Sequence, residues 1–212
     1  MSSNQKGEDI VYVVDDDPHV LDSTHWLLKN SGFRVETHAE PETFLAAYQG
    51  KASGCIILDL RMPGMTGLDI QDELVSIGVK TPVIFITAHG DIPQTVQAMK
   101  LGAWDFIEKP YDPRQLLESV EGALGWARER REAQRRRATY TARFTALSPR
   151  ELEVAREVAG GRSSKEVARR LNLSPRTVET HRYRLMEKVG AQSVAHLVLM
   201  LMEIGEEVPI PE

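Results

Sequence analysis

An apolar run that ends abruptly in a carboxylate constrains this chain more than any other feature. Residues 55–58 are apolar and include two adjacent isoleucines; Asp59 follows, and then a loop that contains Pro63 and Gly64. This pattern predicts a buried strand of a parallel sheet with Asp59 at its carboxyl end. An aspartate there commonly caps the following turn. The alternative is a functional site, because open α/β sheets bind ligands at the carboxyl ends of their strands.

Similar strand ends recur through the first half of the chain, and the recurrence favours a functional site. We expect five strands at residues 10–14, 33–38, 55–59, 82–86 and 105–108, separated by helices at 18–32, 40–48, 68–77 and 92–101, with an exit loop at 88–90. A further helix begins after Asp112-Pro113. Strands that alternate with helices predict a doubly wound parallel α/β sheet. In a flavodoxin-like (βα)5 order, 2-1-3-4-5, the first and third strands lie side by side.

This order brings polar side chains together at one edge of the sheet. Asp15 and Asp16 follow the first strand, and they would meet Asp59, while Thr87 and Lys109 come from the next two strands. Three carboxylates repel one another unless a cation is present, and Mg²⁺ accepts carboxylate and phosphoryl oxygens. The set predicts phosphoryl transfer: Asp59 attacks as a nucleophile, Mg²⁺ and Lys109 neutralise charge, and Thr87 donates a hydrogen bond.

The same residues resemble the receiver domain of two-component response regulators. The resemblance rests on Asp15-Asp16, on Asp59 within Asp-Leu-Arg-Met-Pro-Gly, on Thr87-Ala88 and on Lys109-Pro110. It implies that Asp59 accepts a phosphoryl group from a sensor histidine kinase and that Lys109-Pro110 is a cis peptide. It also implies that Asp16, Asp59 and the backbone carbonyl of Arg61 hold Mg²⁺. Asp15, which the strand order places beside them, completes the predicted metal set.

The resemblance further implies a switch that connects the phosphorylation site to the protein surface. Thr87 and Phe106 occupy the two switch positions, and Phe106 stands where many family members have tyrosine. A simple core role for Phe106 is an equal alternative.

The second half predicts a small all-α domain with a helix-turn-helix. Ser148, Pro149 and Glu151 form a helix-start signature, and a second helix at 164–171 is followed by a turn and a third helix from Pro175. Two short helices across a tight turn, the second rich in long polar side chains, are typical of a helix-turn-helix. We expect DNA contacts from Lys165, Arg176, Thr177, Glu179, Thr180, Arg182, Tyr183, Arg184 and Lys188. Among these, Glu179, Thr180 and Tyr183 are expected to face the bases.

This half resembles the DNA-binding domain of NarL/FixJ and LuxR-type regulators. The matching residues are 148–151, Lys165-Glu166-Val167-Ala168, Leu171, Thr177-Val178 with His181, and Lys188-Val189-Gly190. The resemblance implies a fourth helix at 194–204 used for dimerisation, and RNA polymerase as a partner. His181 has no second histidine at ligand spacing, which favours packing over metal binding.

Charge and cysteine content limit the partners. Residues 1–124 carry a net charge of −10 and residues 125–212 a net charge of +5, which suits a divalent cation in the first half and nucleic acid in the second. Cys55 is the single cysteine, so no internal disulfide can form. No apolar run is long enough for a signal peptide or a membrane span, so we expect a cytoplasmic protein with no membrane partner.

The predicted organisation is a receiver at 8–125, a helical linker at 126–145 and a DNA-binding domain at 146–206. Within the linker, residues 139–145 are expected to form a hinge, and the arginines from Arg128 to Arg137 favour a solvated helix face over a nucleic-acid contact.

The function that unites these features is phosphorylation-dependent transcriptional regulation, in a homodimer when phosphorylated, without enzyme activity. One alternative is an aspartyl-phosphate hydrolase of the haloacid dehalogenase type, but such enzymes place a second aspartate where this chain has Arg61. Another is a constitutive DNA-binding regulator whose receiver is an unphosphorylated scaffold, and the complete set of polar strand ends argues against it.

Overall fold

The chain forms two compact units, residues 1–130 and residues 131–212. The computed structural model describes residues 9–48, 54–88 and 92–208. Of the expected exit loop at 88–90, residues 89 and 90 lie outside these ranges.

The first unit is built on a five-stranded parallel sheet with the order β2-β1-β3-β4-β5. The strands are β1 (Ile10–Val14), β2 (Arg34–His38), β3 (Gly54–Asp59), β4 (Val83–Thr87) and β5 (Asp105–Glu108). The flavodoxin-like order predicted from the sequence is therefore confirmed. Val14 pairs with Leu58, so Asp15 and Asp59 follow at the same level of two adjacent strands.

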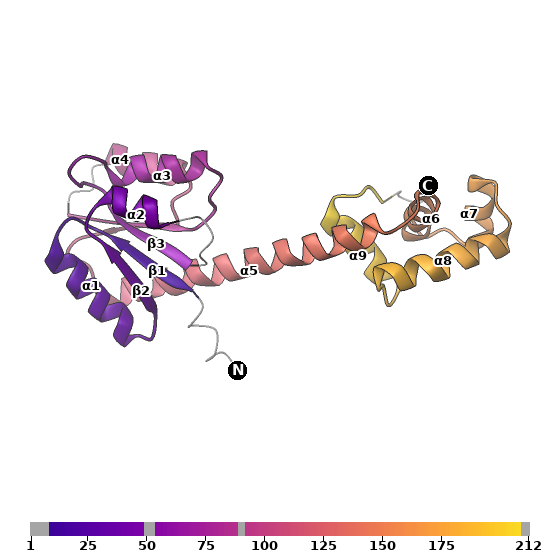
Figure 1. Ribbon diagram of the computed structural model, residues 1–212, viewed down its shortest axis with the longest axis horizontal. Coiled ribbons are helices and arrows are strands. Elements are labelled where there is room, and N and C mark those ends of the chain that lie inside the picture. The colour runs from indigo at the N-terminus through magenta and orange to yellow at the C-terminus, as the bar shows by residue number, and fades with distance from the viewer. Residues whose placement is uncertain (1–8, 49–53, 89–91, 209–212) are drawn as a thin grey trace. The chain divides into compact units, whose positions relative to one another are not determined.

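Helices cover both faces of this sheet (Figure 1). They are α1 (Pro18–Asn30), α2 (Pro41–Ala47), α3 (Gly67–Ser76), α4 (Ile92–Lys100) and the beginning of α5 (Pro113–Thr145). Tyr12 and Val14 of β1 pack with side chains of α2, α3 and α4, whereas Val11 and Val13 pack with those of α1 and α5. Because successive strand residues face opposite sides, one apolar strand contributes to both cores.

The hinge predicted at residues 139–145 is wrong, because α5 continues without interruption to Thr145. The hydroxyl of Thr139 donates to the carbonyl of Arg135, and that of Thr145 to the carbonyl of Thr141, so both threonines are accommodated within the helix. Phe144 is buried in the core of the second unit. Packing of this aromatic side chain stabilises the helix where composition alone suggested a break.

The second unit packs four further helices against the end of α5. These are α6 (Pro149–Ala159), α7 (Ser164–Leu171), α8 (Pro175–Val189) and α9 (Val194–Ile204). Their core includes Val154, Val167, Val178 and Leu197. Among the described residues, no single helix has the length and hydropathy of a membrane span, and only α8 and α9 together, bent by 61°, meet that test.

Candidate functional site

A lysine joins two carboxylates at the carboxyl edge of the sheet. The Nζ atom of Lys109, just after β5, donates to Asp15 Oδ2 at 2.6 Å and to Asp59 Oδ1 at 2.9 Å. Asp15 is 3% exposed and Asp59 is 7% exposed. The structure thus brings together three of the predicted site residues from three different strand ends.

Backbone groups hold both carboxylates in place. Asp15 Oδ1 accepts the N–H of Asp17 at 3.0 Å, and Asp59 Oδ2 accepts the N–H of Arg61 at 2.7 Å. Each aspartate therefore presents one oxygen to the loop that follows it and the other to Lys109. This division fixes the orientation of the carboxylates.

Thr87 and Lys109 are placed by the pairing of β4 with β5. Thr87 ends β4 and is buried, and its carbonyl accepts the N–H of Lys109 at 2.8 Å. The Lys109–Pro110 peptide is cis, which confirms the expectation from the receiver resemblance. Thr87 consequently lies at the same edge as Asp59, one strand further along the sheet.

Asp15 and Lys109 both have raised pKa values, for different reasons. Burial raises the pKa of Asp15, and its hydrogen bond with Lys109 opposes that effect. Burial alone would lower the pKa of Lys109, but its bonds with Asp15 and Asp59 outweigh burial and raise it. Lys109 is therefore held as a cation, and burial still disfavours the charge on Asp15.

The side chains at this edge suit a hard divalent cation, because they offer carboxylate oxygens. One of the carboxylates, Asp15, is buried, and burial disfavours its charge. The three predicted carboxylates are not all gathered, however. Asp16 is exposed, and the residues described contain no group of three or more acidic, histidine or cysteine side chains arranged to hold a metal. The magnesium set of Asp15, Asp16, Asp59 and the Arg61 carbonyl stays a prediction.

Gly67 is a constraint beside Asp59 that sequence reasoning missed. A Cβ atom at Gly67 would lie 2.3 Å from the carbonyl oxygen of Asp59 and 2.9 Å from Phe85 Cε1. The N–H of Gly67 also donates to the carbonyl of Leu60 at 3.1 Å. The start of α3 approaches the Asp59 backbone closely because this position has no side chain. The sequence signal was a glycine eight residues after a candidate nucleophile.

Phe106 is half-buried and lies beside Phe85, with ring centroids 6.3 Å apart. Both the switch role and the core role predicted for Phe106 are compatible with this position.

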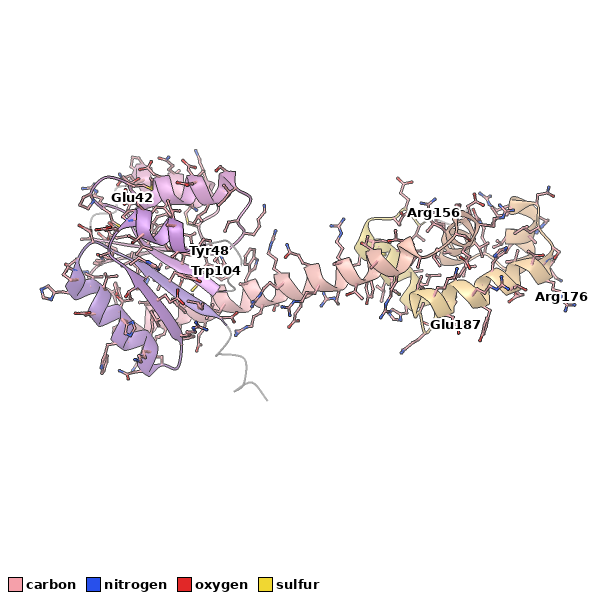
Figure 2. All side chains as sticks on the ribbon, in the orientation of Figure 1. Glu42, Tyr48, Trp104, Arg156, Arg176 and Glu187 are labelled. Carbon is pink, nitrogen blue, oxygen red and sulfur yellow. The ribbon has the colours of Figure 1, made fainter. Side chains whose placement is uncertain are left out.

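The predicted helix-turn-helix is formed by α7 and α8. Asn172 adopts a left-handed conformation with φ 52° and ends α7, and Ser174 caps the start of α8 by accepting the N–H of Thr177. Val178, Leu185 and Val189 of α8 are buried, as predicted. Arg176, Glu179, Thr180, Tyr183, Arg184 and Lys188 are exposed on α8, Thr177 and Arg182 are half-buried, and Lys165 is exposed on α7. Figure 2 shows Arg176 projecting from the amino-terminal end of α8.

Four of these side chains have partners within the domain. Two of the contacts are local to α8, since the Thr180 hydroxyl donates to the carbonyl of Arg176 and the Thr177 hydroxyl lies 2.7 Å from that of Ser174. The other two involve partners from other helices. Lys188 Nζ donates to Glu151 Oε2 at 2.6 Å, and Ser164 donates to Glu179. Glu151 is 4% exposed, and it also accepts the N–H of Ser148 at 2.8 Å. These contacts, led by the bond with Lys188, lower the pKa of Glu151 to about 2. A structural role for Lys188 was not foreseen, because the capping box at Ser148 and Glu151 does not reveal a third partner from α8.

Two segments of the chain match known protein families. Residues 11–121 match the response regulator receiver domain, and residues 145–201 match the bacterial regulatory proteins of the luxR family.

Full-length relatives share both segments. Nodulation protein W of Bradyrhizobium diazoefficiens is 42% identical over 92% of this chain and 86% of its own length. The transcriptional regulatory protein FixJ of the same organism is 37% identical over 92% of this chain and 95% of its own. Among solved structures, the response regulator StyR is similar with a TM-score of 0.83 and 39% identity, covering 92% of this chain and 99% of that one.

The carboxylate–lysine site, the parallel sheet and the helix-turn-helix together define a two-component response regulator. The chain belongs to the NarL/FixJ family, in which a receiver is joined to a LuxR-type DNA-binding domain. It is a phosphorylation-dependent transcriptional regulator of a two-component system.

Proposed function

We propose that Asp59 is the residue that a sensor histidine kinase phosphorylates. The observation that carries this proposal is the Lys109 ammonium held between Asp15 and Asp59. A carboxylate oxygen of Asp59 attacks the phosphorus of a phosphohistidine, and the imidazole nitrogen leaves as the acyl phosphate forms. Lys109, already cationic, lies where it can neutralise the charge that develops on the transferred group.

Asp15, Asp16, Asp59 and the Arg61 carbonyl would hold Mg²⁺, which supplies charge neutralisation for the phosphoryl oxygens. Support comes from the oxygen donors and from the burial that raises the pKa of Asp15.

Labelling by acetyl phosphate tests the assignment of Asp59. With Mg²⁺, the parent should gain one phosphoryl group per chain by intact mass, and Asp59→Asn should gain none. Asp22→Asn, an exposed position on α1, serves as the matched control and should label like the parent. Equal labelling of Asp59→Asn and the parent would overturn the proposal.

Phosphorylation is proposed to act through Thr87 and Phe106 on the face formed by α4, β5 and the first part of α5. Several charge-assisted bonds of ~1.5–3 kcal/mol each supply the ~5.5 kcal/mol needed to move an equilibrium from 1:99 to 99:1. The α4 side of this face exposes Ile92, Val96 and Met99, spaced as on one side of a helix, and this stripe supports dimerisation there.

Sedimentation of the beryllofluoride form tests the dimer, because the adduct on Asp59 stands in for the phosphoryl group. Its mass should be twice that of the untreated protein at micromolar concentration. An equal mass for the beryllofluoride form and the untreated protein would show that this face does not mediate dimerisation on phosphorylation.

DNA readout is assigned to the exposed side of α8. Glu179, Thr180 and Tyr183 would face the bases, whereas Lys165, Arg176, Thr177, Arg182, Arg184 and Lys188 would contact phosphates. The exposure of Tyr183, 71%, supports a position free to reach a groove.

The working organisation that we propose is a receiver at 8–125, a helical connection at 126–145 and a DNA-binding domain at 146–206. RNA polymerase is proposed as a further partner, and the cytoplasm as the compartment, because a kinase and DNA must both be reached.

A further inference from the structure

A cavity of about 440 Å³ lies at the amino-terminal edge of the sheet in the first unit. It is bordered by Pro82 and Val83 at the start of β4, by Ala103 just before β5, by α3, and by the part of α5 up to Arg130. Strands rise about 3.3 Å per residue, so the length of β4 separates it from Thr87 by roughly 13 Å. The cavity is therefore distinct from the phosphorylation site at the opposite edge.

Two indole rings form one side of this cavity. The centroids of Trp104 and Trp126 are 6.2 Å apart, with the rings inclined by 46°, and the two residues are 37% and 36% exposed. Gly122 makes room for Trp104, because a Cβ atom there would lie 3.1 Å from Trp104 Cζ2. Trp104 is labelled in Figure 2. Partly exposed indoles held in fixed positions offer a surface against which an aromatic ring packs favourably.

Two cationic side chains and two buried polar atoms without partners lie among the residues that line the cavity. Lys80 and Arg130 line it, and none of the described lining residues is acidic, although residues 1–124, which supply most of the lining, carry a net charge of −10. The Arg130 guanidinium lies 5.2 Å from the ring centroid of Trp126. In the part of the chain that the structure describes, Arg130 Nε and Gln71 Oε1 are buried and have no hydrogen-bond partner.

An unpaired buried polar atom costs free energy, and a ligand that supplied its hydrogen-bond partner would recover part of that cost. Gln71 is 2% exposed and uses its Nε2 to donate to the carbonyl of Ala98, so its Oε1 is left to accept. The complementary ligand therefore carries an anionic group for Arg130 and Lys80, an aromatic ring for the indoles, and an O–H or N–H donor for Gln71.

We infer that this cavity binds a small aromatic carboxylate that also carries a hydroxyl or amino donor. A volume of about 440 Å³ lies near the lower end of ligand pockets and accommodates one or two rings. The site makes the receiver responsive to a second chemical input besides phosphorylation.

The indole N–H resonances of the three tryptophans test this inference directly, with 4-hydroxybenzoate as the probe. The signals of Trp104 and Trp126 should shift saturably in the full-length protein. Trp26, which is 69% exposed on α1 and outside the cavity, is the internal control and should not move. Two further probes divide the chemistry: 4-hydroxybenzyl alcohol lacks the charge and cyclohexanecarboxylate lacks the aromatic ring. Each should bind at least about tenfold more weakly.

Variants complete the test. Arg130→Gln should weaken the binding of 4-hydroxybenzoate by about tenfold or more, and Lys80→Gln, made separately, should also weaken it. The control variant Arg135→Gln, on the exposed side of α5, should bind the probe like the parent. The inference is overturned if no saturable shift occurs up to about 10 mM probe. It is also overturned if all three indoles shift alike, if the uncharged alcohol binds equally well, or if both variants bind like the parent.

Discussion

Replacing Glu151 with glutamine should destabilise the second unit far more than its position near the start of a helix suggests. The carboxylate accepts from Ser148 N–H at 2.8 Å, from the Ser148 hydroxyl at 3.0 Å and from Lys188 Nζ at 2.6 Å. Glutamine keeps an acceptor but loses the charge. Hydrogen bonds to charged groups contribute ~1.5–3 kcal/mol, whereas neutral ones contribute ~0.5–1.5 kcal/mol. We therefore expect the free energy of unfolding to fall by about 2 kcal/mol.

Glu153→Gln is the matched control on the same helix. Its partner Arg150 is 2.6 Å away, but the two side chains are 36% and 47% exposed, so the loss should stay within about 0.5 kcal/mol. Urea unfolding of the full chain, followed by hydrogen exchange in peptides from α6 and α8, measures both variants. Equal destabilisation by the two substitutions would refute the reasoning.

The contact of Glu151 with Lys188 predicts that the stability of the second unit depends on pH. The pKa of Glu151 is about 2 in the folded protein, below its ordinary value of 4.5, so the folded state favours the ionised form. The stabilisation is present above pH 4.5 and is lost as pH falls from 4.5 towards 2. The difference between parent and Glu151→Gln should shrink over that window. A difference independent of pH would show that the charge is not responsible.

Two further predictions concern the close packing beside Asp59 and the DNA-facing helix. Gly67→Ala should lower the free energy of unfolding by about 1–3 kcal/mol, because the new Cβ would lie 2.3 Å from the Asp59 carbonyl oxygen. Gly125→Ala in α5, whose Cβ would meet nothing within 4 Å, should raise it by about 0.5–1 kcal/mol. Thermal unfolding measures both variants, and an unchanged stability of Gly67→Ala would contradict the structure. Tyr183→Ala should change the DNA sequence that the protein prefers in selection from a random pool. Arg184→Gln should instead weaken binding to all sequences alike and flatten the log-affinity versus log-salt slope by about one unit. An unaltered preference in Tyr183→Ala would show that the base-reading face was misplaced.

The sequence predicted the sheet and the meeting of Asp15, Asp59 and Lys109 because those features follow from strand order. Apolar strands ending in polar residues determine which side chains share an edge, whatever the details of packing. The buried faces of α7 and α8 were predictable for a similar reason, because apolar residues lie at helical spacing within each helix: Val167 and Leu171 in α7, and Val178 and Leu185 in α8.

What the sequence did not predict depends on contacts between distant segments. The hinge at 139–145 was wrong because burial of Phe144 is a tertiary effect that no local propensity records. The bond between Lys188 and Glu151 joins residues 37 positions apart, and the pairing of Trp104 with Trp126 depends on the space left by Gly122. The exposed position of Asp16 was likewise not visible from its place beside Asp15.

The central claim is that modification of Asp59 controls DNA binding, and one measurement tests it most directly. DNA affinity is measured with and without beryllofluoride and Mg²⁺, using duplexes selected from a random pool by the beryllofluoride form. Two joined recognition helices occupy half-sites about 10 base pairs apart, so the parent should gain at least about tenfold in affinity, and only on duplexes with both half-sites. Asp59→Asn should gain nothing under the same conditions. An affinity of the parent that is unchanged by beryllofluoride, or an equal gain in Asp59→Asn, would contradict the account.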